Sequence, residues 1–165
     1  GEKMKGRVEV YCGQGKGKTS SALGHCIKAA GQGKQVIIVQ FLKGKDTEEI
    51  SFIRRLEPEI QLFSFEKYEQ HYMDLTPEQK KEQEHFIGNG LCYTKKVIDT
   101  RQCDVLVLDE VLGLLDLGLL SEEELVALVS GRDEELEVIM TGRRLPDSLK
   151  DWVDDIYCIN TIKES

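Results

Sequence analysis

The sequence predicts an α/β fold in which a mainly parallel sheet is covered by helices on both faces. Three observations predict it. Short apolar runs rich in β-branched residues alternate with helical patterns along the 165 residues. Several of these runs are almost wholly apolar, as expected of parallel strands buried on both faces. A glycine-rich loop joins the first expected strand to the first expected helix, and strand–helix alternation from end to end is typical of this class.

The first part of the chain is predicted to form a βαβ unit. Residues 7–12 alternate as a strand does, and residues 20–30 place small and apolar side chains at helical spacing. The glycines and lysine of 31–34 are expected to end that helix. Residues 35–41 then form a buried strand.

The middle of the chain is predicted to add a helix, a strand and a long helix. A helical pattern runs from about 47 to 56 and ends near Pro58, and residues 60–65 alternate as a strand. Residues 66–75 are polar and irregular, contain Tyr68, His71 and Tyr72, and are the best candidate for a mobile substrate loop. Thr76-Pro77-Glu78-Gln79 is a capping signature for a helix towards Thr100, whose middle is weakened by Gly88 and Gly90.

The last part of the chain repeats the alternation. Residues 104–110 form a buried apolar strand that ends in two acids. Ser121-Glu122-Glu123-Glu124 is a second capping box, for a helix through Val129 that stops at Gly131. Residues 136–141 are expected to be a strand, 146–152 a short helix and 156–159 the final strand.

The glycine-rich loop reads Gly13-Gln14-Gly15-Lys16-Gly17-Lys18-Thr19-Ser20. Between a strand and a helix, such a loop is typical of a phosphate-binding P-loop: backbone N–H groups converge on phosphate oxygens, Lys18 adds positive charge, and the Thr19 hydroxyl can ligate Mg²⁺. The first glycine comes one residue later than the standard spacing, which would place it at Cys12. The alternative is a glycine-rich turn without a ligand.

Two further segments are expected to meet this loop, because ligands collect at the carboxyl ends of parallel strands. Residues 105–110 resemble a Walker B strand, in which Asp109 holds a metal ion or its water and Glu110 is a second ligand or orients a reacting group. Thr141-Gly142-Arg143-Arg144 follows the next strand, where a guanidinium either reaches phosphate or faces solvent. Lys16 has the same two alternatives.

Composition limits the other possibilities. The length fits a single domain over 1–165, with 1–5 as a flexible N-terminus or a cloning remnant. A net charge of −8 argues against nucleic acid as a partner. The chain has no apolar run of the ~20 residues that span a membrane and no secretory pattern, so we expect a cytoplasmic protein.

Cysteines and histidines carry little functional signal. The five cysteines form no Cys-x-x-Cys pair, and most, including Cys103 and Cys158 beside apolar runs, are expected to be buried apolar residues. Cys12 adjoins the loop and is expected to be a packed strand residue rather than a low-pKa thiol. His25 lies on the helix after the loop, and His71 and His85 are isolated from any cysteine or paired histidine, so a structural role is favoured over a ligand role for each. Asp116 and Glu122–Glu124 are interpreted as surface and capping acids.

The quoted motifs resemble those of the ATP:corrinoid adenosyltransferase family, also called cob(I)alamin or cob(I)yrinic acid a,c-diamide adenosyltransferases. The resemblance covers nearly the whole chain in order and includes the shortened loop. Its other parts are Ala22-Leu23-Gly24, residues 29–34, Val39-Gln40-Phe41-Leu42-Lys43-Gly44, Leu108-Asp109-Glu110, the Leu-x-x-Gly pattern at Leu115 and Gly118, and Thr141-Gly142-Arg143.

The resemblance implies a RecA-like P-loop fold, usually dimeric, that transfers the 5′-deoxyadenosyl group of ATP to the Co(I) centre of a reduced corrinoid (cobalamin, cobinamide or cobyrinic acid a,c-diamide), with tripolyphosphate as the leaving group. It also implies Mg²⁺ and a reductase that supplies Co(I). The family holds ATP so that the ribose C5′ is exposed, which would give the displaced Gly13 a meaning. By carry-over, the loop residues bind polyphosphate, Asp109 and Glu110 lie at the Mg²⁺ end, and Arg143 contacts phosphate.

Three departures from the family pattern bear on the acceptor more than on ATP. Lys28 stands where an arginine is usual. The Gly-Phe-Thr-Trp stretch that the family associates with its corrinoid pocket is absent, and residues 66–72 stand in its place. Either Tyr68, His71 and Tyr72 replace the missing aromatic contacts, or the segment is a mobile loop with incidental aromatics. The family's tail rich in His, Pro and Gly is missing from this sequence. A P-loop ATPase or phosphotransferase and a non-catalytic nucleotide- or corrinoid-binding module therefore remain as alternatives.

Overall fold

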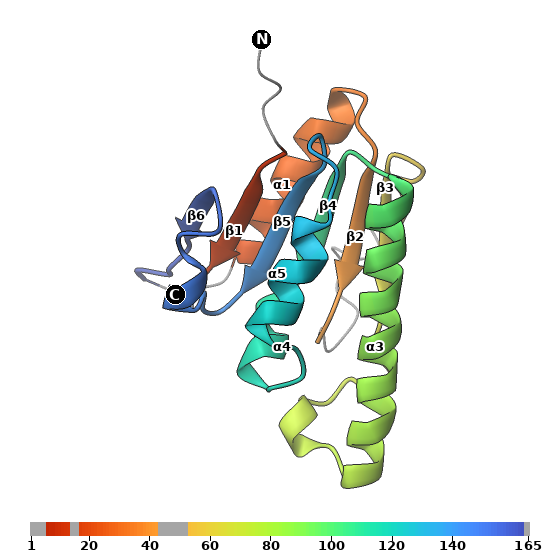
Figure 1. The fold of residues 1–165 in the computed structure, drawn as a ribbon, viewed down its shortest axis with the longest axis vertical. Helices are drawn as coiled ribbons and strands as arrows, with labels where there is room; N and C mark the ends of the chain where they lie inside the picture. Colours follow the sequence, from red (N-terminus) through yellow and green to blue (C-terminus); the bar gives the residue numbers. More distant parts are fainter. Residues whose placement is uncertain (1–5, 14–16, 43–52, 164–165) are drawn as a thin grey trace.

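The structure is a computed structural model that describes residues 6–13, 17–42 and 53–163. Its centre is a six-stranded sheet in the order β3-β2-β4-β5-β1-β6, in which every pairing is parallel (Figure 1). The expected fold class is therefore confirmed. The strands are β1 (Val8–Cys12), β2 (Val36–Gln40), β3 (Ile60–Ser64), β4 (Val105–Asp109), β5 (Glu137–Gly142) and β6 (Asp155–Cys158).

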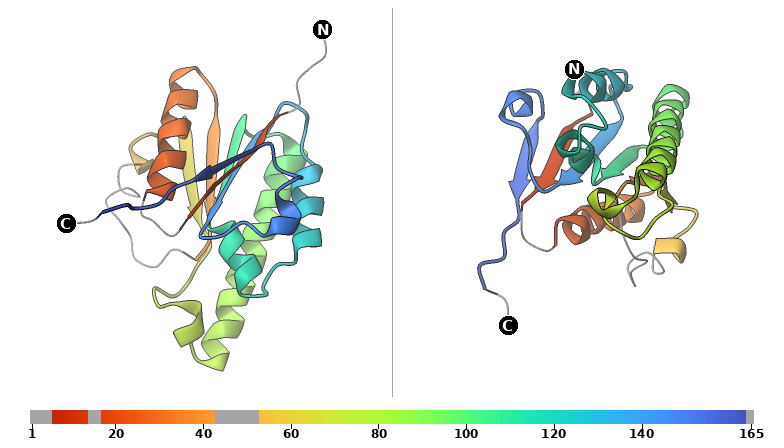
Figure 2. Two further views of the ribbon diagram at one scale, coloured as in Figure 1. Left: turned by 90° about the vertical axis from the view of Figure 1, so that its left-hand side faces the viewer. Right: turned by 90° about the horizontal axis from the view of Figure 1, so that it is seen from below.

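Helices cover both faces of this sheet, as Figure 2 shows in its left-hand view. The helix α1 (Lys18–Gly31) lies on one face, and α3 (Pro77–Thr100), α4 (Val111–Asp116) and α5 (Glu122–Ser130) lie on the other. Alternate residues of each strand supply the two cores. In β4, Val105 and Val107 pack with the α1 side, whereas Leu106 and Leu108 pack with the side of α3 and α5.

The helix starts that the sequence predicts are confirmed by their hydrogen bonds. Thr76 and Ser121 each accept a hydrogen bond from the backbone three residues later, and Gln79 and Glu124 bond back. The helix α3 continues through Gly88 and Gly90. At Gly90 an added Cβ would lie 2.7 Å from the Phe41 ring, so the missing side chain lets the helix pack closely on the sheet.

Other predictions need correction. The short helix expected over 146–152 is a single 3₁₀ turn, Asp147–Leu149. The helix α4 was not predicted, and it follows β4 directly. Cys158 is exposed rather than buried because β6 is an edge strand, and Cys92 is exposed as well. Most of the helix expected from about 47 to 56 lies outside the described residues.

The order of the strands brings the carboxyl ends of four strands together at one edge of the sheet. The helix α1 connects β1 to β2, which are separated in the sheet by β5 and β4. The carboxyl ends of β1, β5, β4 and β2 are therefore neighbours, and the residues after them face a common space. No helix among the described residues is long and apolar enough to cross a membrane.

Candidate functional site

The first part of the site is the loop after β1, where Gly13 is held by two neighbouring segments. Its backbone has φ of +135°, and an added Cβ would lie 2.2 Å from the carbonyl oxygen of Ile159. The Gly13 N–H donates to the carbonyl of Arg143 at 3.0 Å, and the Ile159 N–H donates to the carbonyl of Cys12 at 2.8 Å. Only glycine fits this position without distortion.

The loop leads into the N-terminus of α1. Gly17 immediately precedes the helix with φ of +102°, and no side chain caps the first turn. The first N–H groups of a helix have no partner within the helix and carry its positive dipole end, so this turn favours an anion. Ser20 lies exposed in the same turn. Gln14, Gly15 and Lys16, which the sequence assigns to the phosphate cradle, lie outside the described residues.

Lys18 links the loop to Glu110, the residue after β4. Its Nζ lies 3.7 Å from Oε1 of Glu110 and donates to the carbonyl oxygen of Gly13 at 3.4 Å. The Lys18 side chain is only 14% exposed, so its charge is directed into the site rather than to bulk solvent. A largely buried ammonium group interacts with nearby anions more strongly than a surface lysine does.

Asp109 is the most enclosed charged group at this edge, with 1% of its surface exposed. Its Oδ1 accepts hydrogen bonds from the Thr141 hydroxyl at 2.7 Å and the Thr19 hydroxyl at 3.2 Å. Its Oδ2 accepts from Nε2 of Gln40 at 3.2 Å. Side chains from β2, α1 and β5 thus fix this carboxylate, which is buried but not isolated.

Glu110 immediately precedes the short helix α4 and has the left-handed conformation, with φ of +62°. Its N–H donates to the Thr141 hydroxyl at 2.8 Å, so one hydroxyl joins the two adjacent acids. The next turn packs closely on β5, because an added Cβ on Gly142 would lie 2.4 Å from Cβ of Leu112. The Glu110 carboxylate lies beside Lys18.

The two arginines after β5 differ in their surroundings. Arg144 pairs with Asp116 at 3.2 Å on the surface. Arg143 holds Gly13 through its backbone carbonyl, and its exposed side chain makes no hydrogen bond or ion pair within the part of the chain that the structure describes. Of the pair, Arg143 is therefore the one beside the loop.

The predicted substrate loop, 66–75, is held against the first turns of α3. Gln83 is buried, and its Oε1 accepts from the backbone N–H groups of Lys67 and Tyr68 at 3.0 and 3.3 Å. The Tyr68 hydroxyl donates to Glu82 at 2.7 Å, and the Tyr72 hydroxyl donates to Glu84 at 2.6 Å. Burial and the Glu84 carboxylate raise the pKa of Tyr72 to about 12.

This loop lies at the site's end of the molecule. It includes a 3₁₀ turn, Tyr72–Asp74, and the loop and the start of α3 project beyond the carboxyl ends of the strands (Figure 1). Met73 in this turn is 66% exposed, and His71 immediately before the turn is exposed as well.

Sequence reasoning missed the supporting roles of Gln40 and Thr141. Gln40 is the only polar residue of β2 and its last, and Thr141 follows three apolar residues near the end of β5; a polar residue after such an apolar run could have identified both as site residues. The expectation for Cys12 is confirmed: the thiol is buried, and burial raises its pKa.

The parallel sheet, the glycine loop at the helix N-terminus and the buried aspartate after a neighbouring strand define an α/β protein of the P-loop class. The family model described as ATP:corrinoid adenosyltransferase BtuR/CobO/CobP matches residues 4–165. This chain belongs to that family, whose members are enzymes.

Several curated relatives are similar over almost the whole chain. A corrinoid adenosyltransferase of Escherichia coli K12 is 26% identical, with 98% of this chain and 80% of that protein covered. The corrinoid adenosyltransferase CobA of Salmonella typhimurium is 26% identical, with 99% and 81% covered. An uncharacterized protein of Nostoc sp. PCC 7120 is 33% identical over 93% of this chain, which spans only 43% of that protein's length.

Proposed function

We propose that this protein transfers the 5′-deoxyadenosyl group of ATP to the Co(I) centre of a reduced corrinoid and releases tripolyphosphate. The observation that carries the proposal is the convergence of Lys18, Thr19, Asp109 and Glu110 beside a shortened glycine loop, in a chain of the ATP:corrinoid adenosyltransferase family. Curated relatives that bear the name corrinoid adenosyltransferase support the acceptor class.

The triphosphate is assigned to the loop and to the first turn of α1. The uncapped N–H groups after Gly17 offer hydrogen bonds to phosphate oxygens, and Lys18 adds a charge that is already directed inward. Arg143 is placed beside Gly13 by the backbone hydrogen bond between them. Gln14, Gly15, Lys16 and Ser20 complete the proposed cradle on sequence grounds.

The residues around Asp109 fit a magnesium ion. Mg²⁺ prefers oxygen ligands, and the Thr19 hydroxyl and the carboxylates of Asp109 and Glu110 supply them. The buried Oε1 of Gln40, a residue bonded to Asp109 through its Nε2, has no hydrogen-bond partner among the described residues. It is a further oxygen that could bind a metal ion or its water. When bound, Mg²⁺ would neutralise charge on the triphosphate.

The protein's own residues then need to position and neutralise rather than to move protons. Co(I) is itself a strong nucleophile, so attack on the ribose C5′ requires no general base. The departing triphosphate gains charge at its bridging oxygen, and we assign Lys18 and Arg143, which lie beside the glycine loop, to offset that charge. Holding C5′ and cobalt at attack distance supplies the remaining acceleration.

The corrinoid is assigned to the projection formed by residues 66–75 and the start of α3. The hydroxyls of Tyr68 and Tyr72 are bonded to Glu82 and Glu84, so their rings are held in fixed positions. Together with exposed Met73 they offer apolar surface at the open end of the site. This surface stands where the family usually has its Gly-Phe-Thr-Trp stretch.

The test is product analysis under anaerobic conditions. The protein is incubated with ATP, Mg²⁺ and chemically reduced cobalamin or cobinamide, and the adenosylated corrinoid spectrum and tripolyphosphate are measured together. Equal amounts of the two products are expected. ATP that binds without forming an adenosylated corrinoid would count against the proposal.

Phosphoryl transfer is the second candidate, because a threonine bonded to a buried aspartate beside a P-loop is also the arrangement of ATP-hydrolysing enzymes. The same assay separates the two, since phosphoryl transfer yields ADP in place of tripolyphosphate. Binding of ATP or corrinoid with neither product would assign a non-catalytic binding module. A homodimer and a reductase that supplies Co(I) complete the proposal, and light scattering measures the former.

A further inference from the structure

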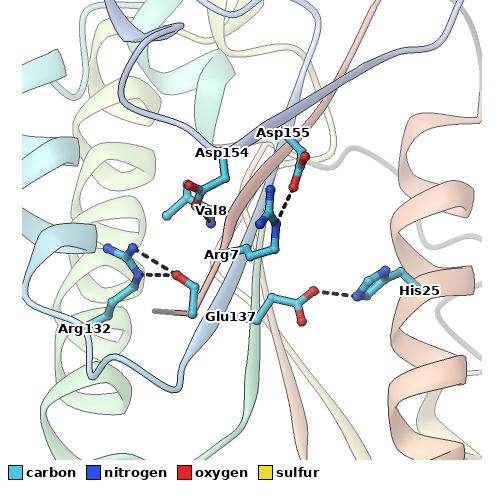
Figure 3. Close-up of polar contacts among 8 residues, drawn as sticks. Arg7, Val8, His25, Arg132, Glu137, Asp154 and Asp155 are labelled. Atoms are coloured by element: carbon cyan, nitrogen blue, oxygen red, sulfur yellow. Dashed lines mark hydrogen bonds and ion pairs between the residues drawn. The ribbon is translucent and has the colours of Figure 1, made fainter. Parts of the chain in front are cut away.

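A second polar cluster lies on the α1 face of the sheet, in the amino-terminal half of the strands. It consists of Glu9 on β1, His25 on α1 and Glu137 at the start of β5, which we call the Glu–His–Glu cluster. Figure 3 shows the imidazole of His25 reaching from α1 to the carboxylate of Glu137. The proposed reaction uses none of these residues.

The geometry of the cluster is that of a set of ligands. One ligand atom from each residue lies within 4.8 Å of the other two. Nε2 of His25 lies 2.5 Å from Oε1 of Glu137. Nitrogen and oxygen ligands lie about 2.0–2.2 Å from a zinc ion, which places two ligands of a tetrahedral site roughly 3.4 Å apart. Small side-chain movements would bring all three atoms to that spacing.

The cluster contains two acidic groups and one imidazole. Glu9 is 6% exposed, its carboxyl group shares a hydrogen bond with that of Glu137, and the other charged groups acting on it are His25 and Asp155. The nearest arginine, Arg7, is paired with Asp155 at 2.6 Å (Figure 3). Two carboxyl groups therefore share a half-buried space with a single imidazole, and a cation bound there would replace the proton that lies between them.

One oxygen of the cluster also lacks a hydrogen bond. Oε1 of Glu137 is buried and has no hydrogen-bond partner among the described residues, although the His25 nitrogen is close to it. The His25 nitrogen and the Glu137 oxygen are therefore close, but their angles are not those of a hydrogen bond. A buried oxygen without a partner is destabilising, whereas two ligand atoms facing a common ion need no hydrogen bond between them.

We propose that the Glu–His–Glu cluster binds a divalent transition-metal ion of the zinc type, separate from the magnesium ion of the phosphate site. One imidazole with two carboxylates suits such an ion, whereas Mg²⁺ prefers oxygen ligands alone. The side chains of His25 and Glu137 are 32% and 19% exposed, so solvent reaches the cluster and can fill the remaining ligand positions. The role of the ion is structural, because it joins β1, α1 and β5.

The test is a metal titration of the untagged wild-type protein after treatment with a chelator. Zn²⁺, and Co²⁺ as a spectroscopic substitute, are added in the presence of millimolar Mg²⁺, which occupies the phosphate site. We expect one ion per chain by calorimetry, a visible Co²⁺ absorption band and a higher melting temperature with Zn²⁺. Wild-type protein that binds no Zn²⁺ at micromolar concentrations would overturn the proposal.

Variants locate the ion. His25→Ala, Glu9→Gln and Glu137→Gln are each expected to weaken Zn²⁺ binding at least tenfold, whereas His85→Ala, which changes an exposed histidine of α3, and Asp109→Asn leave it unchanged. Wild-type affinity in His25→Ala would refute the assignment. X-ray absorption of the zinc-loaded wild type needs no variant to fold: one imidazole among oxygen ligands supports the cluster, and sulfur ligands overturn it.

Discussion

Replacing Thr141 with valine tests the central support of the candidate site. The Thr141 side chain is fully buried at the end of β5, donates to Oδ1 of Asp109 at 2.7 Å and accepts from the N–H of Glu110 at 2.8 Å. Valine has nearly the same shape but can do neither. The change therefore removes two hydrogen bonds without opening a cavity.

The expected loss of stability is about 3 kcal/mol. A hydrogen bond to a charged group contributes about 1.5–3 kcal/mol, and leaving the Glu110 N–H without its acceptor costs about 1–3 kcal/mol more. The expected loss lies in the lower part of the sum of these two ranges, because Thr19 and Gln40 still donate hydrogen bonds to Asp109. With a urea slope of about 2 kcal/mol per molar for a chain of this size, the midpoint moves by about 1.5 M.

The assay is urea unfolding followed by circular dichroism and by the fluorescence of Trp152, the single tryptophan. Thr141→Ser is the matched control, since it keeps the hydroxyl and loses one methyl group, which costs about 1 kcal/mol. Magnesium-dependent ATP affinity is measured in parallel and is expected to fall in the valine variant because Asp109 loses its closest donor. Equal stability of the valine and serine variants would refute the reasoning.

Three further changes test other parts of the structure. Lys18→Ala is expected to weaken ATP binding by about 2 kcal/mol, measured by calorimetry, because it removes a charged phosphate contact; unchanged affinity would contradict the cradle assignment. Gly90→Ala is expected to destabilise the protein by about 1–3 kcal/mol, because the added Cβ would lie 2.7 Å from Phe41. Gly88→Ala is the control: its position has open space around it, so this change is expected to stabilise the protein slightly. Both are measured in the same urea titration. Iodoacetamide at pH 8 is expected to modify the exposed Cys92 and Cys158 quickly and the other three cysteines slowly, as followed by peptide mass spectrometry. The reason is that burial raises the pKa of Cys12 and raises those of Cys26 and Cys103 to about 12. Rapid labelling of Cys26 would contradict its buried position.

The elements that the sequence predicts correctly are those whose signals are local. The six strands are short apolar runs, and α3 and α5 begin at capping boxes whose partners are three residues apart. The helix α4 has no such signal. It has six residues, contains Gly113, and is held by the contact of Leu112 with β5, so it depends on a strand far away in the sequence.

The residues of the candidate site also differ in whether a local sequence signal identifies them. Lys18, Thr19, Asp109 and Glu110 are recognisable because each lies in a motif. Gln40 and Thr141 became part of the site only when the strand order placed β2 and β5 on either side of β4. The sequence indicates that strands are parallel, but it does not say which are neighbours. Polar residues that support a motif from adjacent strands are therefore missed.

The Glu–His–Glu cluster is a further case, and its place in the fold connects it to the phosphate site. The strand β1 carries Glu9 and leads to Gly13, α1 carries His25 and begins with Lys18, and β5 carries Glu137 and ends beside Thr141. An ion bound to these three elements would make the segments that flank the phosphate loop more rigid. If the metal ion makes β1, α1 and β5 more rigid and ATP binds best to the rigid arrangement, each ligand strengthens the binding of the other, and the coupling is reciprocal.

The final prediction follows from this linkage. In the presence of excess Mg²⁺, zinc-loaded wild-type protein is expected to bind ATP about fivefold more tightly than the chelated protein, which corresponds to about 1 kcal/mol of coupling at the lower end of typical values. The His25→Ala variant is expected to bind ATP equally with and without Zn²⁺, because only the ligand set has changed and the phosphate loop is intact. Calorimetry measures both affinities. An identical zinc effect in wild type and variant would show that the ion acts elsewhere, since the coupling can pass through β1, α1 and β5 only when the cluster holds it.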